Sequence, residues 1–430
     1  MTRSSILHEY SLWIAAAVAI LLLALSSVMA FGPSWADAEA DGQKNRAALP
    51  ECARPAWLET TAHPFAVEPL IPTPLPGEER TVGVKQGAYQ EYEQIPAPAA
   101  EPYTLRWRIG VGIPEKNPLY FPWPAQRPGW YLNWSIGYTV TRTLAQRMDP
   151  VRMEAPPEIE LGMDFYPMVR TPQGRLQPAP ELLAQLAAAN PGRTWLIGNE
   201  PDVEWQDNAT PEQYAYGYRC AYTVIKQSDP TAQIAIGGLS QVTPLRLIYL
   251  ERLWRFYAKE FGQEMPVDVW NMHAFVLREE AESWGVRIPP GLEYITQGEL
   301  WDVADHADLA LVRGQIVAMR RWMQEHGQRE KPLLISEYGI LLTAAYGFDA
   351  PHVNAFMLDS FDLFNSLSDA EMGYPADDNR LVQRWVWFST RYPLYPAGNL
   401  FTGYDKPTAV MRTLRDFLDA HGDSTAKTIK

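Results

Sequence analysis

The sequence predicts an α/β protein whose main domain is a (β/α)8 TIM barrel, preceded by an N-terminal hydrophobic segment and a Pro-rich linker. Three observations predict this. An uncharged run lies near the N-terminus, prolines recur up to about residue 100, and strand-like and helix-like patterns alternate after that point. Alternation of this kind is typical of a parallel sheet, whose crossovers are helical. We therefore divide the chain into residues 1–32, 33–102 and 103–430.

The N-terminal segment contains a run without charge, from Leu12 to Phe31. A run of about 20 apolar residues is long enough to span a bilayer. Its more apolar first part is also of signal-peptide length, and Val28–Ala30 resembles a small-residue cleavage site. Arg3 precedes the run and acidic residues follow it, so the positive-inside rule places the rest of the chain outside the cytoplasm. Residues 1–32 are thus a signal peptide or a membrane anchor, and both predict an extracytoplasmic protein, either secreted or anchored by a single helix.

Residues 33–102 carry recurrent prolines without a helical period, which predicts an extended, semi-rigid linker or irregular arm. The formal net charge of -14 and the lack of a long basic run exclude nucleic acid as an expected partner. The two cysteines, Cys52 and Cys220, make no metal-binding spacing, so we expect neither metal nor cofactor. One bridge between them is possible in an oxidising compartment. We expect a monomer.

Eight strand-like runs follow one another in residues 103–430. They are 105–113, 129–136, 159–169, 194–199, 233–239, 267–275, 331–339 and 384–390. Amphipathic helical patterns lie between most of them, at 212–228, 244–261 and 307–326. The first crossover, 114–128, is too rich in proline for a normal helix. An open doubly wound sheet is the alternative fold, but no Gly-rich phosphate loop follows the first strand.

Polar residues stand at the ends of several predicted strands, where a (β/α)8 barrel carries its function. Asn199 and Glu200 end the fourth strand, His273 lies near the end of the sixth, and Glu337 ends the seventh. A lone glutamate at a strand end is more often a cap or a surface charge. Two glutamates that point into one mouth are what glycoside hydrolysis requires: one carboxylic acid protonates the leaving oxygen, and one carboxylate attacks the anomeric carbon. For the acid to stay protonated near neutral pH, its surroundings must raise its pKa.

The motifs GWYLNW, DFYPMV, LIGNEPD, VDVWNMHAF and LLISEYG, in this order over residues 129–339, resemble the Asl1-like glycosyl hydrolase catalytic core. That group includes glycoside hydrolase family 128, whose members cleave β-1,3-glucans, and it belongs to clan A of the glycoside hydrolases. The resemblance implies a retaining enzyme with Glu200 as acid/base and Glu337 as nucleophile. It also implies that Asn199 binds the sugar 2-hydroxyl.

Further residues are predicted to bind substrate. They are His273, Asn133, Trp134, Trp205, Tyr338 and Trp387, with the three tryptophans as platforms for apolar sugar faces. One position departs from the family, which tends to carry an aromatic hydroxyl two residues after the sixth-strand histidine. Phe275 stands there and has no hydroxyl. Tyr338 or Tyr166 would have to compensate. Asp202 is expected to cap the segment after the fourth strand.

The sequence thus predicts a retaining glycoside hydrolase acting on an oligo- or polysaccharide, with a β-1,3-glucan-like glycan as the expected substrate. Two alternatives remain at this point. One is a membrane-tethered carbohydrate-binding or cell-surface module on a barrel that has lost catalysis. The other is a transglycosylase that uses the same residues and transfers the glycosyl group to a sugar instead of water.

Overall fold

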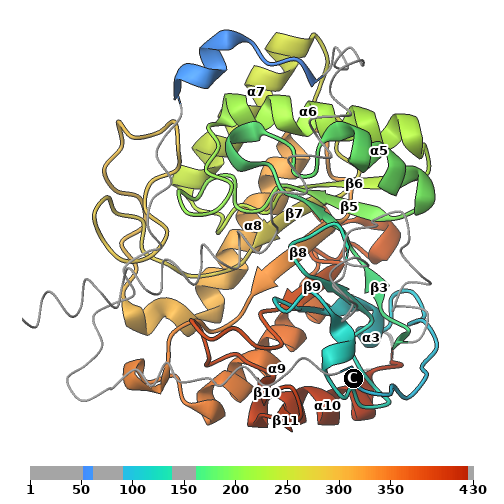
Figure 1. The fold of residues 1–430 in the computed structure, drawn as a ribbon. Helices are drawn as coiled ribbons and strands as arrows, with labels where there is room; N and C mark the ends of the chain where they lie inside the picture. The colour runs from blue at the N-terminus through green and yellow to red at the C-terminus, as the bar shows by residue number, and fades with distance from the viewer. Residues whose placement is uncertain (1–51, 62–90, 138–160, 425–430) are drawn as a thin grey trace, which may run out of the picture. The chain divides into compact units, whose positions relative to one another are not determined.

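The computed structural model describes residues 52–61, 91–137 and 161–424 (Figure 1). The predicted N-terminal segment and most of the predicted linker lie outside these residues. Within the described ranges, no helix is both long and apolar enough to cross a membrane. The chain divides into two compact units, Met1–Ala53 and Arg54–Lys430, and the architecture below is that of the second. Neither Cys52 nor Cys220 is a free thiol, since both are disulfide-bonded.

Most strands lie where the sequence predicts them, although each is shorter. They are β1 (Ile109–Gly112), β2 (Trp130–Leu132), β3 (Asp164–Phe165), β4 (Met168–Val169), β5 (Thr194–Ile197), β6 (Gln233–Ile236), β7 (Trp270–His273), β8 (Leu333–Tyr338), β9 (Arg384–Trp387), β10 (Phe401–Gly403) and β11 (Lys406–Pro407). Apart from the antiparallel pair of β10 and β11, every ladder between these strands is parallel.

The parallel strands form two sheets, with the orders β3-β2-β1-β9-β8-β7 and β4-β5-β6. The last strand, β9, pairs with the first, β1. Isolated parallel bridges, Ala235↔Val269 and Leu239↔Met272, connect the β6 and β7 segments. The strands therefore follow one another in barrel-like order, but the ladders among the described residues do not make one continuous closed sheet. The interruption between β3 and β4 divides the single strand that was expected at 159–169.

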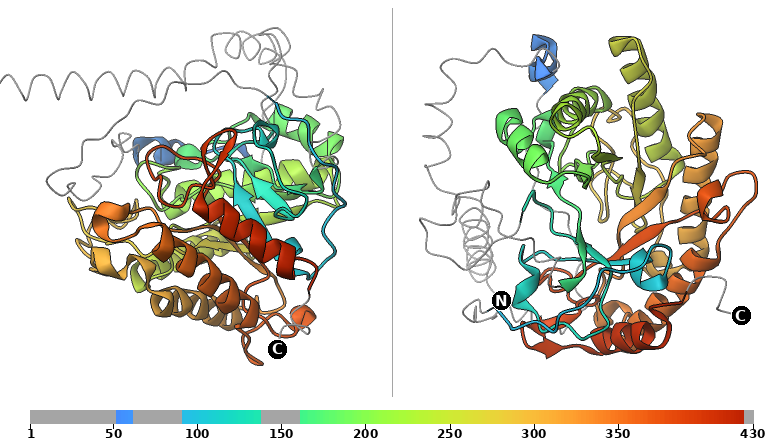
Figure 2. Two further views of the ribbon diagram at one scale, coloured as in Figure 1. Left: turned by 90° about the horizontal axis from the view of Figure 1, so that it is seen from below. Right: turned by 90° about the vertical axis from the view of Figure 1, so that its right-hand side faces the viewer.

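The helices lie outside the strands (Figures 1 and 2). They are α3 (Leu105–Arg108), α5 (Pro180–Ala189), α6 (Pro211–Ser228), α7 (Pro244–Phe261), α8 (Leu309–Glu325), α9 (Ala350–Ser366) and α10 (Ala409–His421). Neighbours in sequence contact one another: α5 with α6, α6 with α7, α8 with α9, and α9 with α10. Short 3-10 helices occupy connections, including η4 (Pro118–Tyr120) in the proline-rich first crossover. No α-helix forms there, as predicted.

The first predicted strand was wrong over residues 105–108, which form the short helix α3. The cause is the residue before it. Thr104 caps the turn by accepting a hydrogen bond from the backbone N–H of Trp107 at 3.2 Å. The N–H groups of Leu105 and Arg106 then donate to the carbonyls of Ser424 and Gly422, far away in the sequence. This long-range pairing replaces a strand ladder.

Helix ends carry the expected signals. Helix α6 begins after Thr210, which forms a capping box with Gln213, and Pro211 occupies its first turn. Helix α7 begins after Thr243 and ends at Gly262, whose φ of 68° is left-handed. These signals fix where each helix starts and therefore which side chains reach the strand ends.

Candidate active site

The inner face of the sheets is set by side-chain alternation along each strand. One buried cluster collects side chains from seven of the strand segments: Trp130, Leu132, Met168, Leu196, Ala235, Val269, Leu334 and Val386. Because side chains two positions apart share a face, the next inward positions toward the carboxyl ends include Trp134, Arg170, His273 and Phe388. Alternation therefore brings side chains from β2, β4, β7 and β9 to one region above the cluster.

A cavity of about 270 Å³ opens at these strand ends. Its lining is mainly aromatic and apolar, with few charged groups. The residues are Pro114, Lys116, Trp134, Arg170, Glu200, Trp205, Gln206, Phe275, Leu277, Trp284, Gly285, Val286, Glu337, Leu341, Leu342, Phe388, Tyr392 and Tyr395. Apolar walls with a few polar groups are typical of a small-ligand site. Both predicted glutamates are in the lining.

Three side chains meet beside this cavity. His273 Nδ1 lies 2.9 Å from Glu200 Oε1, and its Nε2 lies 3.5 Å from Glu337 Oε1. One carboxylate oxygen of each glutamate and a ring nitrogen of His273 all fall within 4.8 Å of one another. All three residues are buried. The histidine thus lies between two carboxyl groups that come from strand ends far apart in the sequence. The same donor set has the composition and spacing to hold a metal ion.

A β-bulge turns Glu337 toward the cavity. Leu334 faces the inner cluster, so regular alternation would also turn Ser336 and Tyr338 inward. The pairing with β7 runs from Met272↔Ile335 to His273↔Glu337, which shows one extra residue in β8. Bulges next to functional sites re-aim side chains in this way. Glu337 therefore faces inward, and Tyr338 turns to the opposite side.

Neighbouring groups hold this trio in place. Trp134 donates its indole N–H to Glu337 Oε1 at 2.6 Å. Gly238 lies directly against the imidazole: a Cβ there would sit 2.4 Å from His273 Cδ2. Only glycine leaves room for His273 at this position. Two lining residues, Trp134 and Glu200, have positive φ angles of 53° and 43°. Backbone strain of this kind clusters at functional sites.

The electrostatics of the trio raise two pKa values. Burial raises the pKa of Glu337 to about 7, and the negative charge of Glu200 adds to this, while His273 opposes it. Burial acts to lower the pKa of His273, but the two glutamates beside it raise it above its ordinary value. The groups are close enough to titrate as a unit. A proton is therefore held at this site up to about neutral pH.

Replacing Glu337 by glutamine should stabilise the protein more at alkaline than at acid pH. The pKa of Glu337 is about 7 in the folded state, against an ordinary 4.5. The folded protein then binds this proton more tightly, so the free energy of unfolding falls as pH rises from about 4.5 to about 7. A shift of this size corresponds to roughly 3 kcal/mol. Thermal unfolding of both proteins at pH 4.5 and pH 8 measures it, and an equal difference at both pH values would contradict the raised pKa.

Trp205 lies where a substrate contact is expected, whereas Asn199 is not among the residues that line the cavity. Asn199 is buried next to Glu200, and its Nδ2 donates to Gln206 Oε1 at 3.3 Å. Its Oδ1 is buried without a hydrogen-bond partner among the described residues. Trp205 lines the cavity. Trp134 also lines it, but its N–H is committed to Glu337.

Three other predicted contacts do not face the cavity. Asn133 is buried with its Nδ2 donating to the carbonyls of Lys116 and Gly137, so it fixes a loop. Tyr338 is turned outward by the bulge, and its hydroxyl accepts from Ser360 at 3.2 Å. Trp387 is also outward, because Val386 is the inward residue, and it donates to the carbonyl of Gly398.

Tyr166 does not supply the missing hydroxyl either. Its OH accepts from Arg384 Nη1 at 2.6 Å, and its ring packs against Trp130 below the site. Phe275 itself lines the cavity and makes an edge contact with the ring of His273. The wall beside the histidine is therefore apolar at this position.

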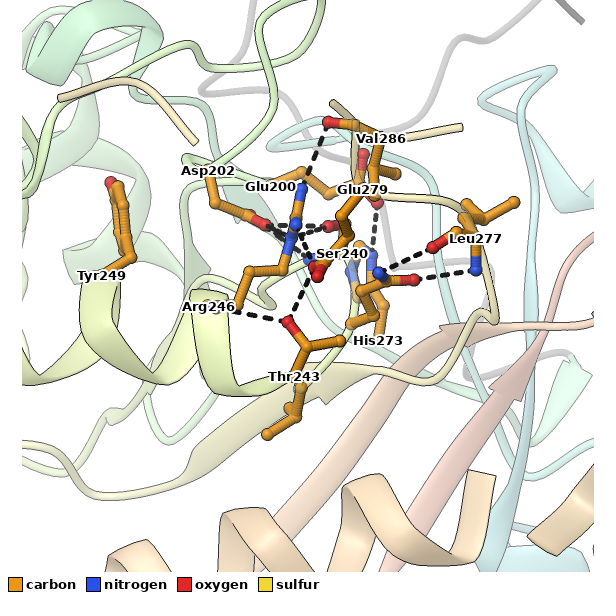
Figure 3. Close-up of polar contacts among 12 residues, drawn as sticks. Glu200, Asp202, Ser240, Thr243, Arg246, Tyr249, His273, Leu277, Glu279 and Val286 are labelled. Atoms are coloured by element: carbon orange, nitrogen blue, oxygen red, sulfur yellow. Dashed lines mark hydrogen bonds and ion pairs between the residues drawn. The ribbon is translucent and has the colours of Figure 1, made fainter. Parts of the chain in front are cut away.

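Asp202 was expected to cap a segment, but the structure gives it a different role. It is fully buried and pairs with Arg246 of α7, whose Nε lies 2.7 Å from Asp202 Oδ2 (Figure 3). Burial raises the pKa of Asp202, and the Arg246 charge opposes that shift. Arg246 also pairs with buried Glu279 and donates to the carbonyl of Val286 at 3.2 Å.

This network joins two parts of the cavity. Asp202 belongs to the turn that follows Glu200, and Val286 belongs to the cavity wall. Ser240 donates to Asp202 at 2.8 Å, and Thr243 donates to Glu279 at 2.7 Å (Figure 3). One buried guanidinium therefore fixes the Glu200 turn relative to the 276–300 loop.

The prediction from sequence missed several lining residues. Arg170 and Phe388 follow strands β4 and β9 directly, and alternation from Met168 and Val386 could have identified both. Lys116, Trp284, Tyr392 and Tyr395 come from irregular connections with no periodic signal. Their positions depend on how the loops pack over the strand ends.

No protein-family model and no curated protein matches the chain. Solved structures do, and they include β-1,3-glucanases of glycoside hydrolase family 128, the group that the motif series resembles. A subgroup II endo-β-1,3-glucanase from Pseudomonas viridiflava has 17% identity and a TM-score of 0.46, over 71% of this chain and 96% of its own. A subgroup I endo-β-1,3-glucanase from Amycolatopsis mediterranei, in complex with laminaritriose, has 17% identity and a TM-score of 0.43, over 72% and 98%. A subgroup III curdlan-specific exo-β-1,3-glucanase from Blastomyces gilchristii, in complex with glucose, has 16% identity and a TM-score of 0.42, over 71% and 96%.

Proposed function

We propose that the chain is a retaining glycoside hydrolase that cleaves a β-linked glycan, with β-1,3-glucan as the first substrate to test. One observation carries this proposal. Glu200 and Glu337 lie beside one cavity, with a carboxylate oxygen of each within 4.8 Å of the other. Retaining enzymes hold the two carboxyl groups about 5–5.5 Å apart, and inverting enzymes about 6.5–9.5 Å apart. The spacing favours the retaining mechanism.

The contacts of each glutamate leave one oxygen for the reaction. Glu337 Oε1 takes the contacts with Trp134 and His273, so among the described residues Oε2 is left to attack the anomeric carbon. Glu200 Oε1 takes the contact with His273 Nδ1, which leaves Oε2 for the leaving oxygen. His273 thereby contacts one oxygen of each carboxyl group, and in this proposal the Oδ1 of Asn199 accepts from a sugar hydroxyl.

The proposed reaction has two steps, and Glu200 regains in the second step the proton that it gives up in the first. In the first, Glu337 forms an ester bond to the anomeric carbon while Glu200 gives its proton to the departing glycosidic oxygen. In the second, Glu200 takes a proton from water, and the resulting hydroxide displaces Glu337 from the anomeric carbon. Both glutamates return to their starting states, and the configuration at the anomeric carbon is retained.

The pH dependence of hydrolysis should report the role of Glu337. A nucleophile must be ionised, so kcat/KM should increase as pH rises through about 7, the pKa of Glu337. Activity that decreases through this pH would instead make Glu337 the proton donor. Glu115 supplies a control, because burial also raises its pKa to about 7 and it is not in the cavity lining. Glu115→Gln should leave the rising limb in place.

The decisive experiment is incubation of the protein with laminarin and with other β-linked glycans. The expected result is hydrolysis that survives chelation by EDTA, with products whose anomeric configuration is retained in NMR spectra. A 2-deoxy-2-fluoro glycoside should label Glu337 covalently. Glycan binding without turnover across the panel would support the inactive binding module instead, and products longer than the substrate would support a transglycosylase. Loss of activity with EDTA would assign the Glu200–His273–Glu337 trio to a metal.

The proposal also covers the architecture, the cellular location and the oligomeric state of the protein. The two parallel sheets make up a (β/α)8 barrel, supported by the pairing of β9 with β1 and the bridges between β6 and β7. The protein is exported, with residues 1–32 as a signal peptide or membrane anchor. It acts as a monomer. Cell fractionation with an antibody to the chain tests the second statement, and sedimentation tests the third.

A further inference from the structure

The cavity contains two cationic side chains that take no direct part in the proposed reaction. Its charged lining residues are Lys116, Arg170, Glu200 and Glu337. The two glutamates have a catalytic use in the proposed function, and the charge of Arg170 helps to keep one of them, Glu337, ionised. Placing two cations in a largely apolar cavity is costly unless an anion accompanies them. This makes the partners of Lys116 and Arg170 informative.

Lys116 forms no ion pair with any of the described residues. Its Nζ donates to the backbone carbonyls of Asn133 at 2.6 Å and Trp134 at 3.4 Å. Carbonyls hold an ammonium in place but do not neutralise its charge, and an ammonium has three donors. The adjacent carboxylate, Glu115, is bonded to Thr390 and lies 4.0 Å from Arg391. The ammonium is therefore fixed at the cavity without a direct ion pair, although the charge of Glu115 acts on it from a distance.

Arg170 keeps part of its guanidinium free. Its Nε pairs with Asp207 at 2.6 Å, and its Nη2 donates to Gln206 Oε1 at 3.2 Å. No partner for Nη1 lies among the described residues, and that atom is not among the buried ones. Burial lowers the pKa of the Lys116 ammonium to about 8, and the charge of the nearby Arg170 guanidinium adds to this, while Glu115 opposes it. The two cations thus act on the same part of the cavity.

We propose that the cavity recognises a β-linked glycan with an anionic substituent, a carboxylate in the first instance, held by Lys116 and by Nη1 of Arg170. The inference rests on the proposed function and names its substrate class. Guanidinium groups match planar carboxylates, and charge-assisted hydrogen bonds are stronger than neutral ones. A sugar whose C6 is oxidised to a carboxylate has this chemistry, and a sulfate ester shares it.

The test compares three ligands that differ in one group. They are a β-1,3-linked gluco-oligosaccharide, the same oligosaccharide oxidised at C6 to carboxylates, and its C6-sulfated form. Calorimetric titration into the full-length Glu337→Gln protein measures binding without turnover. The carboxylated ligand should bind at least about tenfold more tightly than the neutral one. This advantage should shrink as ionic strength rises.

Variants then assign the effect to the two cations. Lys116→Gln and Arg170→Gln, each in the Glu337→Gln background, should lower the ratio of carboxylated to neutral affinity about fivefold or more. Arg170→Lys keeps the positive charge beside Asp207 but loses the paired N–H donors of the guanidinium. It should therefore lower the ratio less than Arg170→Gln does. Lys406→Gln, an exposed residue of β11, removes the same charge away from the cavity and should leave the ratio unchanged. Because the ratio is measured within one protein, a general disturbance of Trp134 cancels.

Several outcomes separate success from failure. Tighter binding of the sulfated than of the carboxylated ligand supports the proposal and names sulfate as the substituent. Equal or tighter binding of the neutral oligosaccharide overturns it, as does an equal effect of Lys406→Gln and Lys116→Gln. If anionic ligands bind selectively but the wild-type protein cleaves none of them, the proposed hydrolase function fails while the anion site stands.

Discussion

Replacing Glu337 by glutamine should reduce glycan hydrolysis by about 10⁴-fold or more, the loss typical of removing a nucleophile. The side chain stays similar in size and can still accept from Trp134, but its amide cannot attack the anomeric carbon. Glu200→Gln should cost about 10²–10⁴-fold, because it removes proton transfer while leaving the nucleophile. Initial rates on the hydrolysed glycan measure both.

Azide can separate the two roles. In Glu337→Gly the anion should attack the anomeric carbon directly and give a glycosyl azide of inverted configuration. In Glu200→Ala, on a substrate with an activated leaving group, azide should give the retained product because the Glu337 ester still forms. The matched control is Tyr338→Phe, whose side chain is adjacent in β8 but faces away, and it should stay close to wild type. Near wild-type hydrolysis by Glu337→Gln would end the proposed mechanism.

Replacing Arg246 by methionine should lower the free energy of unfolding by about 3–5 kcal/mol. The guanidinium is fully buried between Asp202 and Glu279, so its loss leaves two buried carboxylates without their cation. Because both carboxylates are buried, either Asp202 or Glu279 would have to take up a proton, or the surrounding backbone would have to open to water. A loss of this size is a large part of the total stability of a typical domain. Urea denaturation at pH 7 measures it.

The same helix supplies the control. Arg252 also lies in α7, and it pairs with Glu212 at 2.6 Å while its side chain is 41% exposed. An exposed pair contributes only about 0–1 kcal/mol, so Arg252→Met should be nearly silent. Equal destabilisation by the two variants would mean that Arg246 acts only through helix packing. Arg246→Met should also raise KM, because the contact with the Val286 carbonyl that fixes the cavity wall is lost.

The sequence predicted the positions of most strands because buried parallel strands are continuous apolar runs bounded by turns. It also predicted that Glu200 and Glu337 would point into one mouth, since parallel strands bring their carboxyl ends to one edge. His273 was expected to bind substrate, but it lies fully buried between the two glutamates. Two errors came from treating strands as regular. Tyr338 and Trp387 were placed in the mouth, whereas the bulge in β8 and the inward Val386 turn both side chains outward.

The cationic residues of the cavity were harder to predict than its glutamates. Arg170 follows β4 at an inward position and could have been identified by alternation from Met168, but it lies just beyond the strand that was predicted to end at residue 169. Lys116 lies in a proline-rich connection and is held by carbonyls of another loop, a contact that no local pattern encodes. Asp202 was expected to have a local role because its partner, Arg246, is 44 residues away.

The sequence by itself determined the kind of protein: alternating strands and helices, a glutamate at the end of each of two strands, and the resemblance that these motifs carry. These features are local, because apolar periodicity and strand-end residues are set by neighbours in the chain. Only the tertiary structure decided which side chains face the cavity. The register of β8, the placement of Lys116 and the pairing of Asp202 with Arg246 all depend on contacts between distant segments, and such contacts form only when the chain has folded.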